Sequence, residues 1–95
     1  MKILAVEKET DGVEWGKLTD LLKDEARHVY DLYLSDALRE IYFTENKNAV
    51  LMLEAEDKQA ASRLLDTLPL VKAGKIRFEL MELSPYTGYE RIMNK

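Results

Sequence analysis

The chain has 95 residues, enough for one modest hydrophobic core, so we expect a single domain over residues 1–95. Its composition, 46% apolar and 34% charged, excludes an intrinsically disordered chain, and its net charge of −4 disfavours nucleic acid and membrane surfaces as partners. Cysteine is absent, which excludes disulfides and thiolate chemistry, and a single histidine disfavours a zinc centre. We therefore expect a cytoplasmic protein without a metal site, and no apolar run reaches membrane-spanning length.

The first half of the chain predicts a strand, a helix and two further strands. Residues 2–8 predict the first strand, and turn-forming residues follow it. Residues 13–35 have helical spacing, with one apolar stripe along the predicted helix. Residues 37–44 predict a second strand, and a short polar loop connects it to residues 49–53. That third run is apolar on both faces, which places it in the middle of a sheet.

The second half predicts one more helix and one more strand. Asp57 is a natural N-cap for the helix. We expect Pro69 to end this helix, because proline lacks the amide hydrogen that would continue it. Gly74 suits a left-handed turn, and residues 76–81 then alternate as in a half-buried strand. We expect the aromatic tail, residues 86–92, to pack against the protein or a neighbouring subunit.

The order of these elements, strand-helix-strand-strand-helix-strand, is that of the ferredoxin-like α+β fold, βαββαβ, with a four-stranded antiparallel sheet. Right-handed crossovers place both helices on one face of the sheet. The opposite face would then carry a large apolar patch, which burial against a second copy would cover. We therefore expect a homodimer through the sheet face, and assembly into a higher homo-oligomer stays open.

From about Leu22 to Pro85 the chain resembles the muconolactone isomerase-like family of dimeric α+β barrel proteins. The resemblance rests on Leu68-Pro69-Leu70 before the last strand, on Glu25 in the first helix and on Leu38-Arg39-Glu40-Ile41-Tyr42 in the second strand. The segment Pro85-Tyr86-Thr87-Gly88-Tyr89-Glu90-Arg91 is similar to a group of that family without an assigned activity.

The chain departs from the pattern of the isomerase proper in three places. That enzyme has Pro-Tyr-Met after its Leu-Pro-Leu-Phe, whereas here Val71-Lys72-Ala73-Gly74 follows Leu70. Where that enzyme has arginine, histidine and tryptophan side by side, this strand has Arg39-Glu40-Ile41-Tyr42, and a histidine after the last strand is missing. The resemblance implies a dimeric barrel that binds a small molecule. Related barrels include cofactor-free oxygenases and small-ligand binders, so the fold does not choose the activity.

Glu25 is the most informative candidate for chemistry, because helical geometry places it in the centre of the apolar stripe. A carboxyl group there must be paired, protonated or facing a cavity. Burial would raise its pKa toward the range of a general base, which suits proton transfer next to a carbonyl. The alternatives are a structural pair with an arginine and an apolar stripe too narrow to include Glu25.

Five further residues are candidates, and each has a plainer interpretation. Arg39 could anchor a carboxylate or form a rim salt bridge, and His28 could shuttle a proton or lie half-exposed at the surface. Tyr33 could offer its hydroxyl to a ligand or simply pack. Tyr42 is a ligand-binding or interface candidate, and Glu54, at a strand end, is a binding candidate or a solvated carboxylate.

Two functions are compatible with these residues. The first is a cofactor-free enzyme acting on a small organic acid or lactone, with Glu25 as base, Arg39 as carboxylate anchor and His28 as an accessory proton carrier. The second is a non-catalytic dimeric module that binds a small molecule or has a structural role. No phosphate loop, serine triad or metal cluster is present in the sequence.

Overall fold

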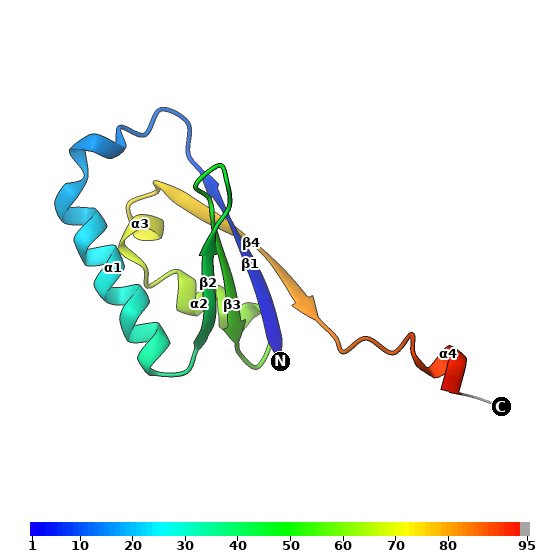
Figure 1. Cartoon of the computed structure of the whole chain (residues 1–95). Helices are drawn as coiled ribbons and strands as arrows, with labels where there is room; N and C mark the ends of the chain where they lie inside the picture. Colours follow the sequence, from blue (N-terminus) through cyan, green and yellow to red (C-terminus); the bar gives the residue numbers. More distant parts are fainter. Residues whose placement is uncertain (94–95) are drawn as a thin grey trace.

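In the computed structural model, which describes residues 1–93, four strands form one antiparallel sheet with helices packed on one of its faces (Figure 1). The strands lie in the order β2-β3-β1-β4, so the apolar third strand is in the interior of the sheet, as its sequence predicts. Their bounds are β1 Lys2–Glu9, β2 Leu38–Phe43, β3 Ala49–Glu54 and β4 Ile76–Leu83. The helices are η1 Trp15–Lys17, α1 Thr19–Leu34, α2 Lys58–Leu65, α3 Pro69–Lys72 and α4 Glu90–Met93. This architecture confirms the predicted ferredoxin-like fold.

The helix predicted over residues 13–35 is two elements, a 3-10 turn (η1) followed by α1. No side chain caps the start of α1, whose N-cap is Leu18. Its end is followed by Asp36 at φ 67°, a left-handed conformation of the kind that commonly terminates helices. This sharp end turns the chain directly from α1 into β2.

The expectation that Pro69 ends the second helix is wrong. The helix α2 begins as predicted, with the Asp57 side chain accepting a 2.8 Å hydrogen bond from the Ala60 amide, but it ends at Leu65. Pro69 is instead the first residue of α3, where a missing amide hydrogen costs nothing and the fixed φ favours the helix. Gly74, at φ 72°, then makes the predicted left-handed turn into β4.

The sheet has a helix-facing side and an open side. Ile3 and Ala5 of β1 and Leu51 and Leu53 of β3 face the helices and are at most 1% exposed. The open side presents apolar residues from three strands without cover, among them Leu4 and Val6 of β1, Val50 and Met52 of β3, and Met81 and Leu83 of β4. The predicted apolar open face is therefore present.

A register shift in β2 changes which of its residues share a face. Between Leu38 and Glu40 the pairing with β3 slips by one residue, as in a β-bulge. Leu38, Ile41 and Phe43 consequently face the helices together, although simple alternation assigns Leu38 to the other side. Glu40 and Tyr42 point to the open face.

The segment after β4 leaves the body of the protein (Figure 1). It runs outward to the short helix α4, and Tyr86, Tyr89 and Ile92 are at least 63% exposed. The expected packing of the tail on its own domain is therefore not found. In the described part of the chain, no helix has the length and apolar character to cross a membrane.

Candidate functional site

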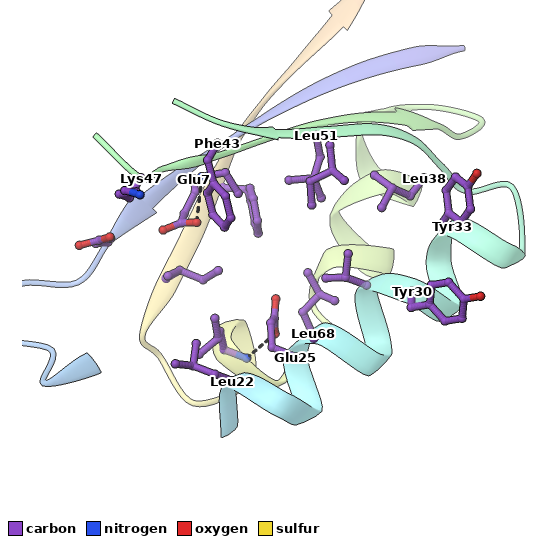
Figure 2. A pocket seen from close by; sticks show the side chains of 18 of the residues that line it. Glu7, Leu22, Glu25, Tyr30, Tyr33, Leu38, Phe43, Lys47, Leu51 and Leu68 are labelled. Atoms are coloured by element: carbon purple, nitrogen blue, oxygen red, sulfur yellow. Dashed lines mark hydrogen bonds between the residues drawn. The ribbon is translucent and has the colours of Figure 1, made fainter. Parts of the chain in front are cut away.

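The helix-facing side of the sheet is not filled along its whole length. Between α1 and the sheet lies an open cavity of about 720 Å³, within the size range of small-molecule sites. Its walls come from α1 on one side and from all four strands on the other, and α3 closes one end. Figure 2 shows the cavity from close by, with α1 below it and the sheet above.

Glu25 projects from α1 into this cavity (Figure 2). Its Oε1 accepts a 2.9 Å hydrogen bond from the backbone amide of Leu70, at the start of α3. Burial raises the pKa of Glu25 above its usual value, and the Leu70 amide and the charge of His28 oppose that rise only partly. The predicted central position and the predicted direction of the pKa are confirmed, and the partner is a backbone amide rather than an arginine.

Glu7 is a second carboxyl group in the same cavity, and it is not among the residues predicted from the sequence. It lies on β1, on the same face as Ile3 and Ala5, and is only 7% exposed. Its Oε1 accepts a 3.0 Å hydrogen bond from the amide of Ala49. Burial raises the pKa of Glu7, and the charges of Glu9 and Glu25 raise it further against the effect of the Ala49 hydrogen bond.

Glu7 could have been found from strand parity alone. Residues two apart on a strand share a face, so the buried positions 3 and 5 place residue 7 on the inner side as well. Its position among the charged residues that close the strand concealed this signal.

The remaining walls are mainly apolar, with aromatic rings at the two ends. Trp15 from η1 contributes at one end. Tyr30 and Tyr33 of α1 stack at the other, with ring centroids 6.4 Å apart, and Figure 2 shows their hydroxyl groups pointing away from the centre of the cavity. Tyr33 therefore lines the cavity with its ring rather than with the hydroxyl that was expected to reach a ligand.

Four of the predicted site residues do not line the cavity. Tyr42 is 62% exposed on the open face of the sheet and donates a 2.9 Å hydrogen bond to Glu40, which raises the pKa of Tyr42. Glu54 lies on the same open face and pairs with the amino terminus of Met1 at 2.9 Å. That pairing lowers the pKa of Glu54, and the charge of Arg39 contributes to it.

Arg39 is the residue whose predicted environment differs most. Simple alternation places it beside Ile41 and Phe43, which do line the cavity, but the register shift at this residue separates it from them. Arg39 is exposed and does not line the cavity, so the structure does not bring it to Glu25.

His28 is also exposed, one helical turn beyond Glu25 on α1. Its Nδ1 lies 3.0 Å from the carbonyl oxygen of Asp24, and the ring does not line the cavity. Of the six residues selected from the sequence, the structure therefore brings Glu25 and Tyr33 together at one cavity.

The chemical groups around the cavity suit proton transfer. Two carboxyl groups with raised pKa values, in a mainly apolar enclosure, can exchange a proton with a bound molecule closer to neutral pH than ordinary glutamates. Within residues 1–93 no group of three or more histidine, aspartate or glutamate side chains is arranged to hold a metal ion.

No protein-family model matches the chain, and no curated protein matches it in sequence. Its fold, in contrast, matches solved structures over nearly the whole length. Muconolactone isomerase aligns with a TM-score of 0.72 at 18% identity, covering 92% of each chain. The dehydrochlorinase TftG from Burkholderia phenoliruptrix AC1100, which acts on 5-chloro-2-hydroxyhydroquinone and was solved with 2,5-dihydroxybenzoquinone, aligns with a TM-score of 0.63 at 18% identity, covering 93% of this chain and 98% of its own. The chain therefore has the fold of the muconolactone isomerase-like proteins, as its sequence resemblance predicts.

Proposed function

We propose that the protein is a cofactor-independent enzyme that moves a proton on a small, mainly apolar molecule bound between α1 and the sheet. The observation that carries this proposal is the position of Glu25, which projects into a cavity of suitable size with a raised pKa. The two fold neighbours, an isomerase and a dehydrochlorinase, support small-molecule chemistry in this fold by analogy.

In the proposed reaction Glu25 acts as the general base. Its carboxylate removes a proton from a carbon next to a carbonyl group, so that the carbon–hydrogen bond breaks and its electrons pass to the carbonyl oxygen as an enolate. The protonated Glu25 then returns the proton to a different carbon of the same conjugated system. The raised pKa favours the first step, because it makes the carboxylate a stronger base, and the basic enolate drives the return of the proton in the second step.

The replacement Glu25→Gln tests this role. A panel of unsaturated γ-lactones and hydroxylated quinones would be incubated in D2O, and carbon–hydrogen exchange followed by NMR. We expect the wild type to exchange at least one compound and Glu25→Gln to lose at least about 100-fold in rate, since glutamine cannot take up the proton. Glu56→Gln, an exposed residue outside the cavity, is the matched control. An unchanged exchange rate in Glu25→Gln would contradict the proposal.

A non-catalytic binding module is the second candidate. It is favoured by the positions of Arg39 and His28, because neither the predicted anchor nor the predicted proton carrier lines the cavity. Saturable binding of compounds from the same panel, without exchange of any of them, would support this candidate over the enzyme.

We further propose that two copies pack through their open sheet faces. Leu4 pairs with Met52, and Val6 with Val50, at the centre of that face, and all four are only partly covered in one copy. A two-fold contact would cover them, and Arg39 with Glu54 would then lie at the interface instead of at the cavity. We expect sedimentation to give a dimer and Met52→Lys to give a monomer, and a monomeric wild type would contradict the proposal. A cytoplasmic location stays a prediction from the sequence.

A further inference from the structure

Glu7 differs from every other charged residue of the described chain, because it alone is buried. A carboxyl group in such a position is costly unless something compensates for lost hydration. One backbone hydrogen bond, from Ala49 to Oε1, is the compensation within residues 1–93. Glu7 is not placed in the proposed proton transfer, so its position calls for another explanation.

The second oxygen of Glu7 is available to a ligand. Within the described chain, no hydrogen bond engages Oε2, and no fully buried side-chain oxygen lacks a partner, so Oε2 is accessible on a residue that lines the cavity. Glu25 has the same arrangement, with Oε1 bound to the Leu70 amide and Oε2 unengaged. Figure 2 shows the two side chains entering the cavity from opposite walls, Glu7 from the sheet and Glu25 from α1.

The charged groups of the cavity wall are unbalanced. They are the carboxyl groups of Glu7, Glu9 and Glu25 and one ammonium group, that of Lys47 in the loop between β2 and β3. The guanidinium of Arg39, which could have bound a carboxylate, lies outside the wall. A bound anion would therefore meet more negative than positive charge, in an apolar enclosure where such repulsion is stronger than in water.

We infer that the cavity selects uncharged ring compounds that carry hydroxyl or enol groups on two positions, held between Oε2 of Glu7 and Oε2 of Glu25, and that it rejects carboxylates. Each carboxyl group accepts one hydrogen bond from the ligand, and the apolar walls contact the ring. Glu7 acts in this arrangement as a specificity residue. The inference deepens the proposed function and rests on it for the location of the site.

Three probes of one size separate the effects of donors and charge. Resorcinol carries two hydroxyl donors and no charge, 1,3-dimethoxybenzene lacks both donors, and 3-hydroxybenzoate carries one donor and a negative charge at neutral pH. Trp15 is the one tryptophan of the chain and lines the cavity, so quenching of its fluorescence reports binding. We expect resorcinol to bind at least about tenfold more tightly than either other probe, as hydrogen bonds to carboxylates allow.

Replacing the carboxyl groups should reduce this discrimination. In Glu7→Gln the amide oxygen still accepts the Ala49 hydrogen bond, so the fold is preserved while the negative charge is lost. We expect the preference for resorcinol over 3-hydroxybenzoate to fall about tenfold in Glu7→Gln and in Glu25→Gln. The preference should stay unchanged in Glu56→Gln, which removes the same charge outside the cavity.

The wild-type measurements alone can overturn the inference, whatever happens to the variants. Equal or tighter binding of 3-hydroxybenzoate, equal binding of 1,3-dimethoxybenzene, or no binding of any probe would each do so. An enzyme that exchanges protons through Glu25 on a carboxylate substrate would overturn the inference and leave the proposed function intact. If the probes bind in the expected order but no compound exchanges protons, the inference about selectivity is supported and the proposed enzymatic function is contradicted.

Discussion

The layer between the helices and the sheet has two halves that differ in packing. Under α2 the layer is solid: this helix of eight residues buries Ala61 and Leu65, and Leu53 in the same core cluster is fully buried. Under α1 it is largely hollow: this helix of 16 residues has no fully buried residue, and Val29 and Leu32 pack against the core only in part. An apolar stripe on a helix therefore predicts which face of the helix is turned toward the sheet. Whether that face packs against the sheet depends on the side chains that the sheet presents to it.

In the hollow half, the two facing walls each carry a carboxyl group. Closing α1 onto β1 would bring Glu25 and Glu7 together and remove the remaining water from both, which is unfavourable for two carboxylates. In the solid half, the facing side chains are alanine and leucine, which gain from contact. The comparison separates the part of the layer that stabilises the fold from the part that offers a binding site.

Leucine truncation in the two halves should give the largest difference. Leu65→Ala truncates a side chain of α2 that is only 3% exposed and lies in the solid half, and we expect a loss of about 2–5 kcal/mol in the free energy of unfolding. Leu22→Ala shortens a side chain that is 39% exposed on the cavity wall, and we expect a loss below about 1 kcal/mol. Urea unfolding of both variants measures this, and similar losses would show that the two halves are packed alike.

A smaller effect should appear in the pH dependence of stability. The pKa values of Glu7 and Glu25 lie above the usual 4.5 in the folded protein, because burial disfavours their charged forms. Their contribution to stability is therefore fully present below the unfolded pKa and is lost as pH rises through the folded pKa values. As the pH rises through this range, we expect the free energy of unfolding to fall more for the wild type than for the double variant Glu7→Gln/Glu25→Gln. Urea unfolding at a series of pH values measures this.

The control for the pH experiment lies on the open face. The pKa of Glu54 is lowered by its pairing with the amino terminus of Met1, so its contribution has the opposite sign and is lost as pH falls. Glu54→Gln should therefore still show the fall in the free energy of unfolding as pH rises through the pKa values of Glu7 and Glu25. Identical pH profiles for the wild type and the double variant would show that the cavity carboxyl groups do not differ from solvated ones.

The order of the elements could be predicted from the sequence because it depends on periodicity and turn residues, which are local signals. The same holds for Glu25, whose position in the apolar stripe follows from helical geometry. The role of Pro69 could not be read in this way, since proline can follow one helix or begin the next, and only the intervening turn at residues 66–68 decides between these positions.

The candidate site was harder to predict because it depends on pairing between distant segments. The register shift at Arg39 arises in the pairing of β2 with β3, and it alone moves this residue away from the cavity-lining face. The hollow itself depends on the distance between α1 and the sheet, which no single segment encodes. Glu7 is the exception, because the alternation of side chains along β1 is enough to predict that it faces the helices.

The segment after β4 has local order although it lies away from the body. The rings of Tyr86 and Tyr89 pack edge to face with centroids 4.9 Å apart, and a side chain in place of the hydrogen of Gly88 would collide with the Tyr86 ring. A surface that receives this segment would therefore meet a pre-shaped ligand, and the entropy lost on docking would be lower than for a disordered peptide. Gly88→Ala would displace the Tyr86 ring and should therefore weaken such docking.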